Sequence, residues 1–313
     1  MKHFFNEDTF LDLSIVIVSY NVRGLLKECL ESIYRTTKYI QFEVYVVDNN
    51  SSDGTIQMIE REFPQVKLIA NKDNIGFAKA NNLAFQKSRG KYILMLNPDT
   101  VILQNSLYKI VNYFEQQPNI GAIGCKMLNS DRTLQPSCYN FPTLLEIFGM
   151  YFIGSRIFSG LKKFDYDKVQ EVDFVRGAFL ALNKQCLEEI GLLDEKLFMF
   201  GEETDLCYRM KQRGWKVIYI PDTVIIHHRG KSTEQISDNM YSQRIRSIIY
   251  YFQKNRGKIS TFLLRAIIFF GVGLRLLLRG VLEIRNRILG KKKKTISKDV
   301  QLEVLRLALG LNK

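Results

Sequence analysis

The feature that most constrains the fold is an alternation of short apolar runs with helical stripes over the first hundred residues. Four runs are too short for helices, and their apolar content predicts strands: Leu13 to Ser19, Phe42 to Val47, Val66 to Ala70 and Tyr92 to Leu96. The first is predicted to be buried on both faces, and the second and fourth are also predicted to be buried. The segments between them carry apolar residues at helical spacing: Arg23 to Thr36, about Thr55 to Phe63, and Phe77 to Ser88. This pattern predicts an α/β fold with a mostly parallel, Rossmann-like sheet covered by helices on both faces.

Three of the predicted strands end in polar residues, at Asp48, Asn71 and Asn97. Ligands bind to open α/β sheets at the carboxyl edge of the strands. Pro98 cannot donate a ladder hydrogen bond, so the fourth strand must end there and leave Asn97 and Asp99 at this edge. A lone carboxylate suits a hard divalent cation that keeps waters and ligand phosphates as its other partners. The alternative is that these residues form a plain turn followed by a helix cap.

Two loops at the same edge carry further candidates for binding. Asp48 sits at the strand end itself, where a carboxylate can accept the N–H of a pyrimidine base. Asp53, in the same loop, is better explained as the cap of the next helix. Asn74 and Gly76 precede the third helix and could place backbone N–H groups near a ligand, which alone is a weak signal.

The middle of the chain is less regular. A helix is predicted from Asn105 to Gln117 and a strand from Ile120 to Met127. The segment from Asn129 to Lys168 has no clear period and is predicted as a loop or flap over the site. A strand follows from Val172 to Leu182, and Gly177 inside it indicates close approach by a ligand or by another backbone.

Glu202, Glu203 and Asp205 place three carboxylates in the first turn of a helix predicted to run to Arg213. Acids at a helix N-terminus are favourable by about 0.3–1 kcal/mol, which is the structural explanation. Stabilising the N-terminus of a helix does not require three acids within four residues. A carboxylate at the rim of a pocket can instead accept the proton of an acceptor hydroxyl as a general base.

His227 and His228 follow strands predicted over Trp215 to Ile220 and Thr223 to Ile226. Side chains alternate along a strand, so only one of the two imidazoles can face the site. A histidine at a strand end is more often structural than a ligand. Imidazole nevertheless completes a set of carboxylate, diphosphate and water ligands well for manganese and acceptably for magnesium.

The positive charge is concentrated at the C-terminal end. Lys+Arg 45 against Asp+Glu 32 gives +13, and 14 Lys/Arg against 3 Asp/Glu place +11 of it in residues 256–313. A nucleic-acid binder would carry its basic stripe on the folded domain, so no nucleic acid is expected as a partner. The five cysteines are odd in number and form no Cys-x-x-Cys pair, so we expect reduced packing residues and a cytosolic face. Met1 to Phe10 is polar and predicts no secretory signal.

The C-terminal region, residues 236–313, is predicted to be helical, basic and separate from a catalytic domain at 1–235. From Ser260 to Leu289 the longest uncharged run is Ala266 to Leu274, short of the roughly 20 residues that span a bilayer. Most of its charged and polar residues fall within one third of the helix circumference: Arg265, Arg275, Arg279, Glu283, Asn286 and Arg287, with Arg285 on the apolar side. This predicts a helix lying in a membrane interface, with Lys291 to Lys294 attracting anionic lipid and Gln301 to Leu309 as a second, weaker amphipathic piece. The alternative is a helix packed on the domain or on a second copy of the chain.

Seven motifs follow one another along the chain: Ser-Ile-Val-Ile-Val-Ser-Tyr-Asn (14–21), Val-Val-Asp-Asn-Asn-Ser-Ser-Asp-Gly-Thr (46–55), Asn-x-x-Asn-x-Gly-Phe-Ala-x-Ala-Asn-Asn (71–82), Leu-Asn-Pro-Asp (96–99), Gly-Ala-Phe-Leu (177–180), Phe-Gly-Glu-Glu-Thr-Asp-Leu-Cys-Tyr-Arg (200–209) and His-His-x-Gly-x-Ser (227–232). Together they resemble family 2 glycosyltransferases, most closely the bacterial rhamnosyltransferase-like branch. The resemblance covers about residues 12 to 235.

The resemblance implies a GT-A fold and an inverting, metal-dependent transfer of a sugar from a nucleoside diphosphate. Asp48 would read the base. Asp99 would be the metal ligand of a degenerate Asp-x-Asp motif in which position 97 is Asn, and His227 would be the metal-binding histidine. Glu203 falls where the family has its catalytic base, although many relatives carry Asp there, and Asp205 is the next candidate.

The residues expected to contact the nucleotide-sugar are Ser19, Tyr20, Asn21, Asp48, Asn74, Gly76, Lys79, Asn97, Gly177 and Glu202. The expected cofactor is Mn²⁺ or Mg²⁺, and the expected donor is a dTDP- or UDP-sugar, with rhamnose as a candidate. The expected acceptor is lipid-linked or an oligosaccharide, and the expected location is the cytoplasmic face of the cell membrane, with peripheral or monotopic attachment. An oligomer is compatible with the sequence.

Two rival functions remain open. A nucleotidyltransferase could use a related sheet and metal site, and it would release pyrophosphate from a nucleoside triphosphate. A non-catalytic membrane scaffold would bind nucleotide weakly or not at all, and the presence of Asp99, Glu203 and His227 together argues against it.

Overall fold

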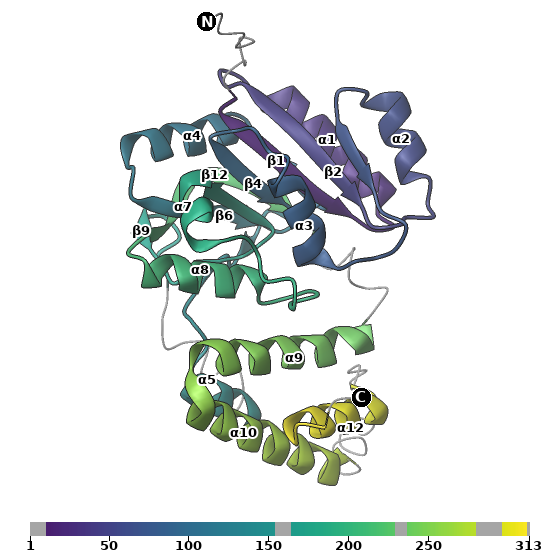
Figure 1. Ribbon diagram of the computed structural model, residues 1–313, viewed down its shortest axis with the longest axis vertical. Helices are drawn as coiled ribbons and strands as arrows, with labels where there is room; N and C mark the ends of the chain where they lie inside the picture. Colours follow the sequence, from purple (N-terminus) through teal and green to yellow (C-terminus); the bar gives the residue numbers. More distant parts are fainter. Residues whose placement is uncertain (1–10, 154–163, 229–236, 280–295, 312–313) are drawn as a thin grey trace, which may run out of the picture. The chain divides into compact units, whose positions relative to one another are not determined.

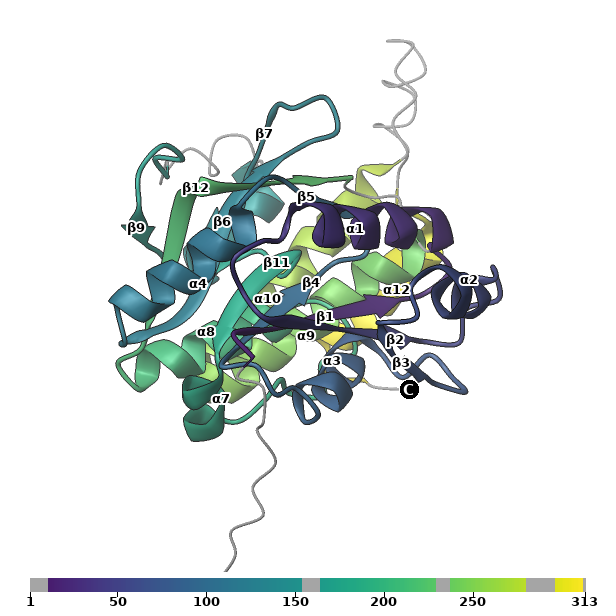
Figure 2. The same cartoon turned by 90° about the horizontal axis from the view of Figure 1, so that it is seen from above.

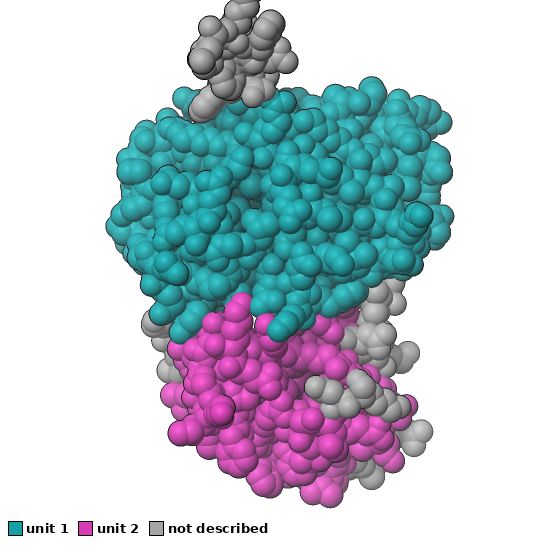
Figure 3. Space-filling model, in the orientation of Figure 1, with its two compact units in different colours: residues 1–141, 165–198, 202–232 teal, residues 142–164, 199–201, 233–313 magenta. Residues whose placement is uncertain are grey.

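The computed structural model describes residues 11–153, 164–228, 237–279 and 296–311. The chain forms two compact units, shown in different colours in Figure 3. Unit 1 comprises Met1–Phe141, Asp165–Phe198 and Glu202–Ser232, and unit 2 comprises Pro142–Phe164, Met199–Gly201 and Thr233–Lys313. Unit 2 therefore includes two segments that the sequence places within the N-terminal domain.

Unit 1 is built on a ten-stranded sheet with the order β3-β2-β1-β4-β11-β6-β12-β5, in which β7 also pairs with β6 and β9 with β12 (Figure 1). The strands are β1 (Leu13–Ser19), β2 (Phe42–Asp48), β3 (Lys67–Ala70), β4 (Tyr92–Leu96), β5 (Thr100–Ile102), β6 (Ile120–Leu128), β7 (Leu134–Gln135), β9 (Gln170–Glu171), β11 (Phe179–Asn183) and β12 (Lys216–His227). The first four strands run parallel to one another, whereas β11 is antiparallel to β4 and β6. The predicted mixed α/β fold with a mostly parallel sheet is confirmed.

Helices cover both faces of this sheet, with α1, α2 and α4 on one face and α3, α7 and α8 on the other (Figure 2). Their bounds are α1 (Arg23–Thr36), α2 (Thr55–Glu62), α3 (Phe77–Phe85), α4 (Ser106–Gln116), α7 (Lys184–Ile190) and α8 (Glu202–Gln212).

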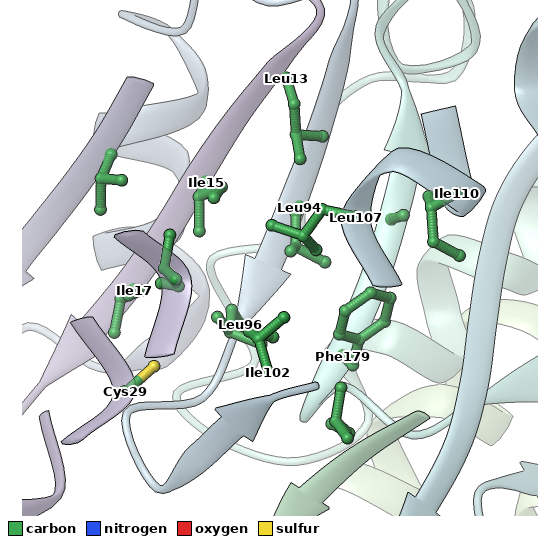
Figure 4. Close-up of a cluster of buried hydrophobic side chains, with 14 of the residues drawn as sticks. Leu13, Ile15, Ile17, Cys29, Leu94, Leu96, Ile102, Leu107, Ile110 and Phe179 are labelled. Atoms are coloured by element: carbon green, nitrogen blue, oxygen red, sulfur yellow. The ribbon is translucent and has the colours of Figure 1, made fainter. Parts of the chain in front are cut away.

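The core on the α1 and α4 side follows from the alternation of side chains along the strands. Leu13, Ile15 and Ile17 of β1 point to this face and pack with Leu94 of β4 and Phe179 of β11 (Figure 4). All of β1 is buried, as expected for a central strand covered on both faces. The five cysteines are free and buried, which confirms that they are packing residues.

The loop predicted from Asn129 to Lys168 is wrong over part of its length. This stretch contains β7, β8 (Cys138–Tyr139), helix α5 (Leu144–Phe148) and one turn of π-helix, η1 (Gly149–Ile153). Helix α5 begins with a capping box, in which Thr143 Oγ1 accepts the Glu146 N–H and the Glu146 carboxylate accepts the Thr143 N–H. The Thr-x-x-Glu signal was in the sequence, but the short helix after it showed no period.

The strand predicted from Val172 to Leu182 is two strands, β10 (Phe174–Val175) and β11. They separate because β10 pairs with β8, whereas β11 pairs with β4 and β6. Gly177 lies in the connection between them, not inside a strand. Conversely, the two strands predicted between Trp215 and Ile226 are the single strand β12, whose register against β6 shifts between Ile220 and Val224.

The described residues of unit 2 form α5, η1 and three longer helices, α9 (Ser237–Asn255), α10 (Gly257–Leu277) and α12 (Lys298–Ala308). Helix α10 packs against all the others. The weaker amphipathic piece predicted at Gln301 to Leu309 falls mainly within α12, which is capped by the Ser297 hydroxyl. The predicted basic run Lys291 to Lys294 and the predicted helical residues after Arg279 lie outside the described residues.

Candidate active site

The carboxyl ends of β1, β2, β3 and β4 lie together at one edge of the sheet. Ser19 pairs in register with Asp48, Asp48 pairs with Ala70, and Ile17 pairs with Leu96. This register brings together the polar residues at the ends of these strands, as the sequence predicts.

Asp48, the candidate for reading the base, is fully buried at the end of β2. Its Oδ2 accepts the Ser51 N–H at 2.8 Å. Its Oδ1 is buried and has no hydrogen-bond partner among the described residues. A buried carboxylate oxygen without a donor is costly, so a ligand N–H placed there would be favourable.

A network of amides shapes the neighbouring loop. Asn49 Nδ2 donates to the Gly76 carbonyl at 3.2 Å and to Asn74 Oδ1 at 3.3 Å, and Asn71 Nδ2 donates to Asn49 Oδ1 at 2.9 Å. The sequence suggested that the Gly76 N–H could face a ligand. In the structure this N–H donates to Asn74 Oδ1 within the loop. Gly76 has φ +89°, and a Cβ there would lie 2.8 Å from the Phe198 carbonyl oxygen, so only glycine fits.

The other predicted contacts are spread along the same edge. Asn21 adopts φ +53° and joins the end of β1 to the next loop, because its Oδ1 accepts the Ser52 N–H at 2.8 Å. Ser19 is buried, whereas Tyr20 is 38% exposed. Lys79 is exposed in the first turn of α3.

Strand β5, which the sequence did not reveal, places Asp99 beside the end of β12. It runs antiparallel to β12 with Thr100 opposite His227, and the His228 N–H donates to the Asp99 carbonyl at 2.8 Å. His227 Nε2 lies 3.3 Å from Asp99 Oδ1, and both side chains are buried. The alternation along β12 separates the two histidines as expected, since His228 Nδ1 instead lies 2.8 Å from Ser130 Oγ.

Gln135, which the sequence did not single out, fixes the orientation of the His227 ring. Its Nε2 donates to Asn129 Oδ1 at 2.7 Å and to the His227 carbonyl at 3.2 Å, so its Oε1 is the atom 2.6 Å from His227 Nδ1. An amide oxygen accepts, so Nδ1 carries a proton, and in this tautomer of the neutral ring the Nε2 lone pair faces Asp99. A lone pair and a carboxylate oxygen repel each other unless a proton or a cation lies with them.

This pair fits a divalent cation. Adjacent ligands of an octahedral ion at about 2.1 Å lie roughly 3 Å apart, close to the Nε2–Oδ1 separation of 3.3 Å. A buried carboxylate and an imidazole oriented by a buried glutamine are suitable donors for Mn²⁺ or Mg²⁺. Among the described residues no group of three or more His, Cys, Asp and Glu side chains could hold a metal, so the remaining ligands would be waters and phosphate oxygens.

The three acids at the start of α8 have different environments. Glu202 is 5% exposed, and its burial, followed by the nearby Glu203 carboxylate, raises its pKa well above the usual range. Glu203 is only partly buried. Asp205 is buried and accepts from Arg209 Nε at 2.9 Å, while Arg209 also donates to three backbone carbonyls, that of the last residue of α7 and those of the two residues after it. This ion pair gives Asp205 a structural explanation, so it is a weaker candidate for a base than Glu203.

Gly177 lies against both Glu203 and the end of β4. A Cβ at Gly177 would lie 3.7 Å from both Cβ and Cδ of Glu203 and 3.1 Å from Met95 Cε. The next residue, Ala178, accepts the Asn97 N–H at 3.0 Å. Glu203 therefore lies beside the connection that leads into β11 at this edge of the sheet, and the absence of a side chain at Gly177 lets the backbone pass close to Met95 and Glu203.

Comparison with known proteins decides the family. The profile described as "Glycosyltransferase like family 2" matches residues 12–248. The chain belongs to this glycosyltransferase family. The sequence-based assignment to family 2 glycosyltransferases is confirmed.

Two curated relatives are rhamnosyltransferases. The N-acetylglucosaminyl-diphospho-decaprenol L-rhamnosyltransferase of Mycobacterium tuberculosis is 24% identical over 238 residues, which cover 71% of this chain and 77% of the relative. Rhamnosyltransferase WbbL of Escherichia coli K12 is 23% identical over 250 residues, which cover 77% of this chain and 93% of the relative. The resemblance to the rhamnosyltransferase-like branch is confirmed at this modest identity.

Solved structures of GT-A glycosyltransferases share the fold. A mannosyltransferase from Pyrobaculum calidifontis in complex with GDP-Man and Mn²⁺ aligns over 97% of this chain and 88% of its own, with a TM-score of 0.59 and 17% identity. GalNAc-T7 with UDP, GalNAc and Mn²⁺ aligns over 79% of this chain with a TM-score of 0.56 and 17% identity, and the match spans about half (49%) of the GalNAc-T7 chain. The predicted GT-A fold is confirmed.

Proposed function

We propose that this glycosyltransferase is inverting and metal-dependent, and that it transfers a sugar, with rhamnose as first candidate, from a nucleoside-diphosphate sugar. The proposed acceptor is lipid-linked or a polysaccharide in cell-surface glycan synthesis. One observation carries the proposal: the Asp99–His227 pair, Glu203 beside Gly177, and Asp48 all lie along one sheet edge. The names of the two rhamnosyltransferases support the sugar, and the decaprenol in one of them supports the acceptor.

Each group in this arrangement has a task that suits its chemistry. Glu203, partly exposed beside Gly177, would remove the proton of the acceptor hydroxyl as that oxygen attacks the anomeric carbon. Attack from the face opposite the diphosphate inverts the configuration of this carbon. Asp48 Oδ1 would accept an N–H of the base.

Asp99 Oδ1 and His227 Nε2 would hold Mn²⁺ or Mg²⁺, with Gln135 keeping the imidazole in the ligating tautomer. The cation, when bound, would neutralise negative charge on the leaving diphosphate as a Lewis acid.

The proposed location is the cytoplasmic face of the cell membrane, with peripheral or monotopic attachment to an anionic surface. Free cysteines and the lipid-linked substrate in a relative's name support this location. Among the described residues, one helix, α10, is long and apolar enough to cross a membrane, which alone is weak support.

A binding screen tests the donor and the cation. Affinities for dTDP-, UDP- and GDP-sugars are measured by titration calorimetry with and without Mn²⁺. We expect tightest binding of a dTDP- or UDP-sugar, strengthened by Mn²⁺. Affinity that is unchanged by the cation, or release of pyrophosphate from a nucleoside triphosphate, would contradict the proposal.

Replacing Glu203 by Gln tests the base. We expect kcat to fall by about 10²–10⁴-fold with donor affinity unchanged, because the amide cannot accept the proton. The matched control is Glu188→Gln, an exposed acid on α7. NMR of the product reports the anomeric configuration. Unchanged turnover in the Gln variant would place the base elsewhere, and retained configuration would exclude a single inverting displacement.

A further inference from the structure

Helix α10 exposes an entirely apolar stripe. From Ile259 to Leu277 every exposed residue is Ile, Leu or Phe, and the six members are Ile259, Phe262, Leu263, Phe270, Leu274 and Leu277. Ile259 and Leu277 are 79% and 83% exposed. At 1.5 Å per residue the stripe is about 27 Å long. Exposed apolar patches of this extent mark interaction sites.

The arginines of α10 lie on the opposite side, toward the other helices of unit 2. Arg275 Nη2 donates to the Met150 carbonyl at 3.0 Å, and Arg265 Nη1 lies close to Gly310, just after α12. Both side chains are only partly exposed. The predicted amphipathic pattern is present, but its charged side packs on the protein and its apolar side is the one left outside. This arrangement argues against the alternative that the apolar side packs on the same chain.

The segment predicted to be a flap extends this apolar surface. Tyr151 of η1 lies against Gly271 of α10, where a Cβ would come within 2.5–2.8 Å of the Tyr151 side chain. The Arg275 guanidinium covers the Tyr151 ring at 4.8 Å, and the Tyr151 hydroxyl lies 3.2 Å from that of Tyr241 on α9. These contacts hold α5 and η1 beside α10 as one rigid piece.

The exposed side chains of α5 and η1 are also apolar. They are Leu145, Phe148, Met150, Phe152 and Ile153. Phe148 and Phe152 stack on each other, with ring centroids 4.8 Å apart. Because α5 and η1 pack directly against α10, unit 2 carries a second set of exposed apolar side chains on elements that contact the helix with the stripe.

We propose that the exposed apolar residues of α10 and of α5–η1, together called the docking face, insert into the interfacial layer of an anionic lipid bilayer. The inference deepens the proposed membrane location by naming its surface, and it does not depend on the transfer chemistry. Residues 256–313 carry 14 Lys/Arg against 3 Asp/Glu, and α10 contains no acid. A second copy carries the same surplus of positive charge in this region and would be repelled, whereas an anionic membrane surface would attract it.

The face lies in the interface and does not cross the bilayer. The side of α10 opposite the stripe packs against α9 and α12, with Leu264 and Ile268 fully buried. A spanning α10 would have to shed both helices or carry their charged side chains into hydrocarbon. An apolar stripe backed by polar helices is the pattern of a monotopic anchor.

The test is flotation of the full-length protein with vesicles of phosphatidylcholine containing 30% phosphatidylglycerol, without donor or acceptor. The decisive variant is Leu145→Ser with Met150→Ser, two exposed positions far from α10 in sequence. We expect vesicle affinity to fall about tenfold or more, since burying one such side chain contributes a factor of about ten or more. Phe262→Ser with Phe270→Ser should lower it similarly, because both pairs belong to one face.

The matched control is Tyr39→Ser with Val169→Ser, two exposed apolar residues of unit 1, which should leave flotation unchanged. Thermal unfolding confirms that each variant folds, and donor binding without vesicles reports on the site in unit 1 independently. Parental affinity in the Leu145 and Met150 variant would overturn the proposal. A parental protein that forms a dimer, fails to float with vesicles and becomes monomeric in this variant would also overturn the proposal. The docking face would then bind a second copy of the chain.

Discussion

Replacing Gln135 by Leu should weaken metal binding without touching a ligand. Gln135 is 1% exposed, and its Oε1 lies 2.6 Å from His227 Nδ1. Leucine removes the amide oxygen that accepts the ring N–H and leaves that group buried. The ring can then turn or adopt the other tautomer, and Nε2 no longer presents its lone pair beside Asp99.

The size of the effect follows from two independent estimates. Leaving one buried donor unsatisfied costs about 1–3 kcal/mol. Loss of a partner that orients a metal-ligating histidine typically weakens metal affinity by about 10–100-fold, or roughly 1.4–2.7 kcal/mol. We therefore expect the Kd for Mn²⁺ to rise about 10–100-fold in Gln135→Leu.

Electron paramagnetic resonance of free Mn²⁺, titrated in the presence of nucleoside diphosphate, measures this Kd without turnover. The matched control is Gln135→Glu, which keeps an acceptor for the Nδ1 proton and should hold the Kd within about threefold of the parent or lower it. Circular dichroism checks that both variants are folded. A Leu variant that binds Mn²⁺ as tightly as the parent would refute the inference that Gln135 sets the ligating tautomer.

Three further substitutions test the surroundings of the site. Glu202→Gln should stabilise the fold increasingly as pH rises. Burial and the Glu203 carboxylate raise the native pKa of Glu202, so the parent loses stability as pH rises above the unfolded pKa of about 4.3, whereas Gln does not ionise. The difference between the urea midpoints of variant and parent, compared at pH 5 and pH 8, measures this effect. Gly76→Ala should cost about 1–3 kcal/mol in urea unfolding, because φ +89° with an extended ψ suits glycine alone; an unchanged midpoint would contradict this. Arg209→Leu should cost about 1.5–3 kcal/mol, since it removes a hydrogen bond between two charged groups from the buried Asp205 carboxylate, and a loss below 1 kcal/mol would show that the ion pair is dispensable.

Local pattern was sufficient for the first half of the sheet. The bounds of β1, α1 and β4 were predicted to the residue, because β-branched runs and helical stripes are set by nearby residues. The polar strand ends were predicted as well, since parallel strands must end at a common edge. The sequence alone therefore identifies Asp48 and Asp99 as candidate site residues.

Distant pairing could not be predicted. The approach of Asp99 to His227 depends on β5 joining β12, and a strand of three residues gives no periodic signal. Gln135 lies in a two-residue strand, and its role exists only because β7 pairs with β6 beside the end of β12. Likewise the amphipathic pattern of α10 predicted a polar side and an apolar side, but not which of them the neighbouring helices would cover.

Unit 2 takes residues from three separate parts of the sequence, and Tyr151 of the first part lies against Gly271 of the last part. In a chimera that exchanged only the residues after 233 for those of a relative, Tyr151 would have to pack against the relative's helix. Any residue larger than glycine at position 271 would clash with it. Tail exchange between members of the family should therefore succeed only when 142–164 is transplanted with it, so these two stretches are expected to diverge as a matched set.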